Sequence, residues 1–342
     1  MTSLEELAKK LNVSRATLDR VIHDRPGVKK ETKELILKRI NEIGYKPNSA
    51  GKALALQKKL NFGIILSSDL TPEDNTLFSL ILEGMQLCIE RLQNRGVNFI
   101  IRRMTTGRAE DQVKAIDEFI KMGVTGIAIC PEGERKKEIP AAVQRAREKG
   151  IIVTCYFNHI EADFNYFVGS DSAKEGRVAV DLLEKFMHGA GEVALFSGFL
   201  HNTVHQTRIA SAVSKIHEYD NLRIVANVSG NYTENIAYNS CLEIIRNHPD
   251  VKGIIASCGG IAGIVTALKE CNQFDKVKVI FFDFTTKAEI FVMEGLVDAL
   301  IGVDLIKLGY CTIKSLYELA IYGFANEIET TMPMLVKTKE SL

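Results

Sequence analysis

Residues 43–66 read IGYKPNSAGKALALQKKLNFGIIL, and they divide the chain into two parts with different periodicities. Tyr45-Lys46-Pro47-Asn48 has the composition of a linker, and we expect residues 49–56 to form one short helix after it. Residues 62–66 are a short apolar run rich in β-branched side chains, which predicts a buried strand. Before this stretch the apolar residues are spaced as in helices. After it, predicted strands and helices alternate.

Upstream, the spacing of apolar residues predicts helices over residues 4–11, 15–22 and 30–43. Asn12 tolerates the left-handed conformation of a tight turn, and Ser14 is a suitable N-cap for the second helix. Two short helices joined by such a turn and followed by a third have the size of a helix-turn-helix domain. The positions expected to face its core are Leu4, Leu7, Ala8, Leu11, Ala16, Leu18, Val21, Leu35, Ile36, Ile40 and Ile43.

Downstream, short apolar runs alternate with amphipathic helical stretches. This alternation predicts an α/β fold with parallel sheets and helices on both faces. So many strands over residues 61–342 suggest two doubly wound lobes. The expected strands are 62–66, 97–101, 126–130, 151–155, 166–170, 192–196, 222–228, 253–257, 277–282, 298–303 and 334–337.

The charge is unevenly distributed along the chain. The 342 residues have a net charge of zero, but residues 1–60 contain 14 Lys or Arg and 7 Asp or Glu. Residues 1–60 therefore carry a net charge of +7, and the rest of the chain carries −7. A basic head on an acidic body indicates that the head alone binds a polyanion.

Composition excludes several classes of protein. Hydrophobic residues make up 46% and charged residues 25%, which excludes wholesale disorder. No apolar run is long enough for a membrane helix, and acids stand where a signal peptide would be apolar, so we expect a cytoplasmic protein without a membrane partner. Seven scattered cysteines without a C-x-x-C pair are expected to pack as small buried hydrophobes.

Helix 15–22 carries side chains that can read DNA. Arginine donates paired hydrogen bonds to guanine, alanine packs on a thymine methyl group, and small polar groups suit phosphates. Asp19 either accepts from a cytosine amino group or pairs with a neighbouring arginine, and both readings stay open. A three-helix domain used for protein contacts is the alternative. The candidate DNA-contact residues are Ser14, Arg15, Ala16, Thr17, Arg20 and His23.

Many residues of the head and the linker match one known family in register, namely Leu7-Ala8, 13–17, Arg20-Val21, Gly27-Val28, Thr32, 43–48 and Ala53-Leu54. Through these residues the head resembles the lactose-repressor (LacI/GalR-type) family of bacterial transcription regulators. The resemblance implies that residues 49–56 are a hinge helix that folds on operator DNA, with Leu54 wedged between base pairs in the minor groove. It adds Asn48, Lys52 and Leu54 to the expected DNA contacts.

Two positions depart from the family. It usually has Ser where this chain has Asp19, and a better helix former than Gly51 in the hinge. Glycine costs up to about 1 kcal/mol in a helix interior. We therefore expect the folding of the hinge to depend more strongly on DNA.

The resemblance extends more loosely through the body and implies a fold like that of type I periplasmic binding proteins. The expected domains are a helix-turn-helix domain at 1–48, a hinge and linker at 49–60 and an effector-binding domain at 61–342. Lobe one is expected at about 61–158 and 287–320, and lobe two at about 159–286 and 321–342. Ligands of doubly wound sheets bind outside the carboxyl ends of the strands, here between the lobes.

Polar and aromatic residues follow several of these strands. The resemblance assigns ligand binding to Arg208 and sugar-hydroxyl binding to Asp283, and it treats residues 167–177 mainly as a strand-to-helix scaffold. Charged groups make strong hydrogen bonds to hydroxyls, and aromatic rings stack on sugar C–H surfaces. The expected ligand contacts are Asn75, Phe78, Arg102, Phe157, Asn158, Arg208, Ser257, Asp283 and Asp304.

The sequence contains no catalytic constellation. His201 and His205 have a metal-compatible spacing but lack the H-E-x-x-H base, and Gly259-Gly260 begins neither a dinucleotide-binding nor a P-loop motif. There is also no G-x-S-x-G nucleophile elbow. We therefore expect neither an enzyme, nor a cofactor, nor a bound metal.

Together these features predict a ligand-responsive transcriptional regulator. A homodimer would bind a near-palindromic operator, and a sugar, polyol or sugar acid between the lobes would release or retain it. Repression relieved by the ligand is the default, with corepression and activation left open. The alternatives are an enzyme of doubly wound fold, or a cytoplasmic sugar-binding or sugar-processing protein that uses the head for protein contacts.

Overall fold

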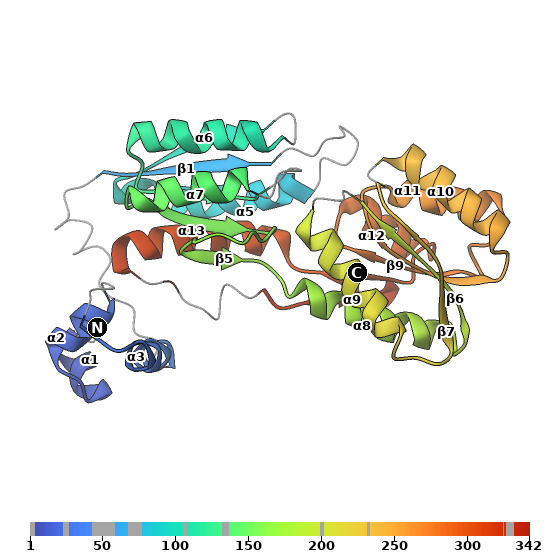
Figure 1. Ribbon diagram of the computed structural model, residues 1–342, viewed down its shortest axis with the longest axis horizontal. Coiled ribbons are helices and arrows are strands. Elements are labelled where there is room, and N and C mark those ends of the chain that lie inside the picture. Colours follow the sequence, from blue (N-terminus) through green and yellow to red (C-terminus); the bar gives the residue numbers. More distant parts are fainter. Residues whose placement is uncertain are drawn as a thin grey trace.

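The computed structural model describes residues 4–22, 27–42, 59–67, 77–104, 108–131, 137–198, 202–230, 233–323, 325 and 332–342. Within these ranges the chain forms a small helical head and two α/β lobes (Figure 1). The expected hinge helix at 49–56 lies outside the described residues. So do five predicted site residues, which are His23, Asn48, Lys52, Leu54 and Asn75.

The head is a three-helix domain, as its periodicity predicted. Asn12 has a φ of 54°, and the backbone N–H of Thr17 donates to Ser14 Oγ over 3.0 Å, which confirms the turn and the N-cap. Two residues expected in the core of the head are not buried: Leu35 is 51% exposed, and Ala16 is exposed. The helix faces that pack against the neighbouring helices carry Ile36 and Leu18 in their place. The helices are α1 (Leu4–Leu11), α2 (Arg15–Ile22) and α3 (Lys30–Glu42).

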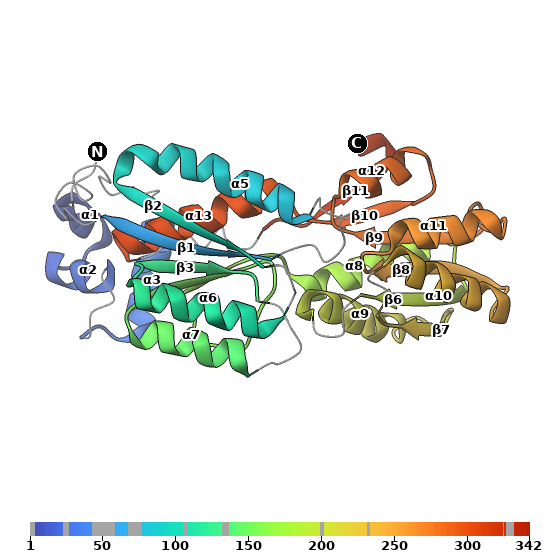
Figure 2. The ribbon, with the colours of Figure 1, turned by 90° about the horizontal axis from the view of Figure 1, so that it is seen from above.

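The first lobe is a parallel sheet in the order β2-β1-β3-β4-β5. Helices α5 and α13 cover one face and α6 and α7 the other (Figure 2). Gly84 and Gly309 let α5 and α13 touch, because a Cβ on either would lie under 2 Å from a backbone oxygen of the other helix. The elements are β1 (Leu60–Leu66), α5 (Leu77–Leu92), a 3-10 turn (Gln93–Arg95), β2 (Val97–Arg103), α6 (Ala109–Met122), β3 (Gly126–Ile129), α7 (Glu138–Glu148), β4 (Ile152–Tyr156), β5 (Tyr166–Val168) and α13 (Leu305–Tyr322).

The second lobe is a sheet in the order β11-β10-β9-β8-β6-β7, parallel except for the pairing of β10 with β11. Helices α8 and α9 pack on one face and α10, α11 and α12 on the other. The elements are α8 (Ser172–Phe186), β6 (Gly191–Ser197), α9 (Thr203–Ile216), β7 (Leu222–Val228), α10 (Glu234–Asn247), β8 (Val251–Ser257), α11 (Ile261–Glu270), β9 (Lys278–Phe282), α12 (Thr286–Met293), β10 (Ala299–Gly302), β11 (Leu335–Lys337) and a 3-10 turn (Lys339–Ser341).

The α/β class with two parallel-sheet lobes is confirmed, but the chain crosses between the sheets later than predicted. Residues 166–168 pair with β4 in the first sheet, although we expected residues 159–286 to belong to lobe two. Residues 299–302 pair with β9 in the second sheet, although they were assigned to lobe one. The reason is that an apolar run predicts a strand but carries no local signal for the sheet it joins.

Five of the seven cysteines are buried, as expected for small core hydrophobes. Burial raises the pKa of Cys88 and of Cys241 to about 12, so these thiols stay protonated at neutral pH. Within the described ranges, no helix combines the length and apolar character that a membrane crossing requires.

Candidate functional site

A buried charge cluster lies where α8, α9 and β9 of the second lobe meet. Arg208 on α9 is only 1% exposed. Its Nη1 and Nη2 donate to the two carboxylate oxygens of Asp283 over 2.9 and 2.8 Å, and its Nε donates to Glu175 Oε2 over 2.8 Å. The ring of Phe282 lies 4.6 Å from the guanidinium carbon. The predicted Arg–Asp pair thus exists, and we call it, together with Glu175 and His205, the Arg208 cluster.

Local features of the chain bring these side chains together. Asn202 caps α9 by accepting from the backbone N–H of His205 over 3.1 Å. Gly176 on α8 lets α9 approach, because a Cβ there would lie 2.1 Å from the backbone oxygen of Arg208. Asp283 has a φ of 67°, a left-handed conformation at the point where β9 ends, and its N–H donates to Ile301 of β10.

The cluster has a marked electrostatic character. Burial alone would lower the pKa of Arg208, but the carboxylates of Asp283 and Glu175 outweigh it and raise the pKa. Burial and then the Arg208 charge lower the pKa of His205 to about 4, against a smaller opposing effect of Asp283. Arg208 is therefore always charged and His205 is neutral at physiological pH.

Several buried polar atoms near the strand ends have no hydrogen-bond partner among the described residues. They include Glu175 Oε1 and His205 Nδ1 in the Arg208 cluster, Ser257 Oγ at the end of β8, and Asn158 Oδ1 after β4. A buried polar group without a partner costs about 1–3 kcal/mol. Atoms of this kind are suited to bind a polar ligand.

The first lobe contributes an aromatic and amide group after β4. The rings of Phe78 and Phe157 meet edge to face with centroids 6.3 Å apart, and Phe157 has a φ of 60°. Asn158 is buried and its Nδ2 donates to the backbone oxygen of Pro131 over 3.1 Å. Next to it, the backbone oxygen of His159 accepts from Thr203 Oγ1 at the start of α9 over 2.9 Å. The two lobes therefore touch directly between these two groups of predicted residues.

Two predicted ligand residues have partners within the protein. Arg102 pairs with Glu118 on α6 over 3.2 Å and lies over the ring of Phe119, because its side chain extends from β2 toward that helix. Asp304 is the N-cap of α13, where its Oδ1 accepts from the backbone N–H of Lys307 over 2.8 Å. Both side chains thus make structural contacts, and their role in ligand binding stays a prediction.

Sequence reasoning missed Glu175 and Gln112. Residues 167–177 were read as a scaffold, yet Glu175 is fully buried and pairs with Arg208. Gln112 on α6 is 1% exposed and donates to the backbone oxygen of Cys130 over 2.8 Å at the end of β3. The available signal was an acid directly before Gly176 in an apolar helix face, because charged residues are rarely buried unless they are paired.

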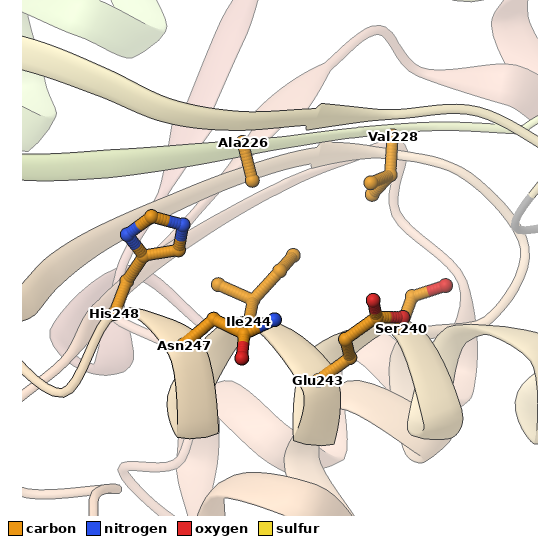
Figure 3. Close-up of a pocket in the computed structure, with 7 residues that line it drawn as sticks. All are labelled: Ala226, Val228, Ser240, Glu243, Ile244, Asn247 and His248. Carbon is orange, nitrogen blue, oxygen red and sulfur yellow. The ribbon is translucent and has the colours of Figure 1, made fainter.

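A separate cavity of about 180 Å³ lies between edge strand β7 and α10 (Figure 3). It contains none of the predicted ligand residues, and it is smaller than the roughly 300–1,000 Å³ of ordinary ligand pockets. Its lining residues are Ala226, Val228, Ser240, Glu243, Ile244, Asn247 and His248.

On the head, α2 presents the predicted DNA-reading side chains to solvent. Arg15, Ala16 and Arg20 are all exposed, whereas Leu18 is buried in the core of the head. The hydroxyl groups of Ser14 and Thr17 are hydrogen-bonded to each other over 2.8 Å at the start of the helix. The exposed face of α2 therefore has the residue types that insertion into a major groove requires.

Two family models match the chain. The model for bacterial regulatory proteins of the lacI family matches residues 3–48, and the model for a periplasmic binding protein domain matches residues 70–323. The second match alone spans more than half of the chain.

Curated relatives of the chain are described as transcriptional repressors and regulators. The ribose operon repressor of Lactococcus lactis is 24% identical over 258 residues, which cover 75% of this chain and 72% of that protein. The HTH-type transcriptional regulator AscG of Escherichia coli is 22% identical over 83% of this chain and 82% of that protein. The probable HTH-type transcriptional repressor ExuR of Bacillus subtilis is 27% identical, but the match spans only 42% of this chain and 43% of that protein.

Solved structures share the fold of the two lobes. GanP, a glucose-galactose binding protein from Geobacillus stearothermophilus, superposes with a TM-score of 0.74 at 19% identity, covering 84% of this chain and 99% of that chain. A solute binding protein from Bacillus halodurans with bound myo-inositol has a TM-score of 0.73 at 18% identity, over 82% of this chain and 95% of that chain. At these identities the likeness concerns the fold alone.

Proposed function

This chain belongs to the lacI family of bacterial regulatory proteins, and we propose that it represses a sugar- or polyol-catabolic operon until a small effector binds between its lobes. The observation that carries the proposal is the buried Arg208–Asp283 pair at the strand ends, with unpartnered polar atoms around it. The sugar-binding relatives of the same fold support the choice of a polyhydroxylated effector.

The head supplies the DNA contacts. Arg15 and Arg20 on the exposed face of α2 read base edges in the major groove, and Ser14 and Thr17 bind phosphates. A homodimer places two such helices in successive major grooves of a near-palindromic operator. Leu54 of the hinge segment enters the minor groove, and Asn48 and Lys52 contact the DNA as well.

The effector acts by changing how the lobes close. It bridges the Arg208 cluster of the second lobe and the Phe157–Asn158 segment of the first. The hydrogen bond from Thr203 to His159 marks where the lobes already meet. A ligand shifts this equilibrium only if it binds the closed and open states unequally. Contacts with both lobes provide that difference.

The test begins with selection of bound sequences from a random DNA pool by the full chain. We expect a near-palindrome, and release of that DNA by a sugar or polyol. Arg15→Ala should lose affinity chiefly for the selected sequence, by about 1–3 kcal/mol, because it removes a base contact. Arg39→Ala, which removes an exposed arginine from α3, is the control with the same change of charge.

Two outcomes would contradict the proposal. Selection that yields no preferred sequence would exclude a specific operator. An unchanged sequence preference in Arg15→Ala would exclude α2 as the reading helix.

A further inference from the structure

The Arg208 cluster holds more negative than positive charge. One guanidinium lies between two carboxylates, and the side chains of Arg208, Glu175 and Asp283 are 1%, 0% and 8% exposed. We propose that Glu175 makes this wall of the site favour an effector without negative charge, such as a neutral polyol or an amino sugar. Sugar acids and sugar phosphates would bind more weakly. This inference rests on the proposed function and adds the charge class of the effector.

The charges of the Arg208 cluster do not cancel. Asp283 alone would neutralise Arg208, and Glu175 adds a second negative charge beside it. His205, the remaining member of the cluster, is neutral at physiological pH and supplies no positive charge. A carboxylate or phosphate brought to Asp283 would therefore meet a net repulsion, which low dielectric strengthens.

The hydrogen-bonding groups of the site favour a ligand that donates hydrogen bonds. Arg208 has five N–H donors, and carboxylates of the protein already occupy three of its nitrogens. The Nδ2 of Asn158 also donates to the protein, to the backbone of Pro131. The buried atoms left without partners in the described chain include the acceptor oxygens Glu175 Oε1 and Asn158 Oδ1. Acceptors need donors, which hydroxyl and ammonium groups provide and ionised acids do not.

Glu175 occupies a position at which the hydrogen bond to Arg208 does not require a charge. It lies on α8 and reaches Arg208 because Gly176 brings α8 and α9 together, and the two helices run side by side in both views (Figures 1 and 2). If Glu175 had only a structural role, a neutral acceptor for the Nε–H of Arg208 would suffice. Glutamine has the same shape and keeps that acceptor, so Glu175→Gln removes the charge and leaves the hydrogen bond.

The experiment measures dissociation constants by calorimetry, on the full chain, for matched ligand sets. Each set contains a sugar, its 2-amino derivative, its uronic acid and its 6-phosphate, in the gluco, galacto and manno series. We expect the neutral or amino member of the responding set to bind at least about tenfold more tightly than its acid and its phosphate. In Glu175→Gln this preference should shrink about tenfold or more, because one negative charge is gone.

Glu184→Gln is the matched control, because Glu184 lies on the same helix nine residues further along, about 13 Å away along the helix axis. Its ligand preference should equal that of the wild type. An acid or phosphate that binds the wild type as tightly as its neutral counterpart would overturn the charge selection, while leaving a sugar-responsive regulator in place. Equal preference in Glu175→Gln and the wild type would overturn the role of Glu175.

Failure of all sets to bind would overturn the sugar-responsive function itself, and the charge inference with it. The wild-type comparison needs no variant, so it decides the charge class even where Glu175→Gln fails to fold. Circular dichroism of each variant before titration identifies that case.

Discussion

Replacing Arg208 by Met tests the electrostatics of the cluster most directly. The substitution keeps an unbranched, flexible side chain but removes three hydrogen bonds of 2.8, 2.9 and 2.8 Å to two buried carboxylates. It leaves Glu175 and Asp283 in the interior without their cation. Removal of one partner of a buried ion pair typically costs about 3–5 kcal/mol, and here two carboxylates lose the same partner. We therefore expect the unfolding free energy of the second lobe to fall by at least about 3–5 kcal/mol.

The measurement is equilibrium unfolding in urea, followed by far-UV circular dichroism. A triple variant, Arg208→Met with Glu175→Gln and Asp283→Asn, removes the charges together and is the decisive comparison. It should recover most of the lost stability, because no uncompensated buried charge remains. If the single variant loses less than about 1 kcal/mol, or if the triple variant is less stable than the single one, the reasoning from buried charge is refuted.

Two further predictions concern the same lobe. Gly176→Ala should destabilise it by about 1–3 kcal/mol, because the new Cβ would lie 2.1 Å from the backbone oxygen of Arg208 and must push α9 away. Thermal melting measures the loss, and Lys174→Ala, at an exposed position of the same helix, is the control. His205 has a folded pKa of about 4, below its ordinary value of 6.5, so the unfolded chain takes up the proton first as the pH falls. Stability should therefore be complete above about pH 7 and decrease by up to about 3 kcal/mol between pH 6.5 and 4. His205→Gln should remove this part of the pH dependence, and equal pH profiles for the two proteins would contradict it.

Much of the local structure was predictable. Every expected strand lies within a residue or two of an observed one, and the turn at Asn12 and the cap at Ser14 have the predicted geometry. The Arg208–Asp283 pair was also predicted, but through the family resemblance and not through periodicity. The distinction matters because no rule of spacing links two residues that lie 75 positions apart.

Three polar side chains have partners that the sequence did not reveal. Arg102 found Glu118 on α6, Asp304 found the backbone N–H of Lys307, and Glu175 found Arg208 on another helix. Arg102 lies near the end of β2, Asp304 directly before α13 and Glu175 in the first turn of α8. Only the packed structure shows which partners compete for each of them.

The amino-acid sequence alone determined the helix-turn-helix head, the alternation of strands and helices and the basic charge of the first 60 residues. These depend on side-chain periodicity, caps and turns, whose interactions extend over a few residues. Tertiary structure decided that β5 joins the first sheet and β10 the second, that Leu35 faces solvent, and that Glu175 is buried against Arg208. Strand pairing and buried ion pairs join residues far apart in the chain, and their energies depend on desolvation that exists only once the lobes have packed.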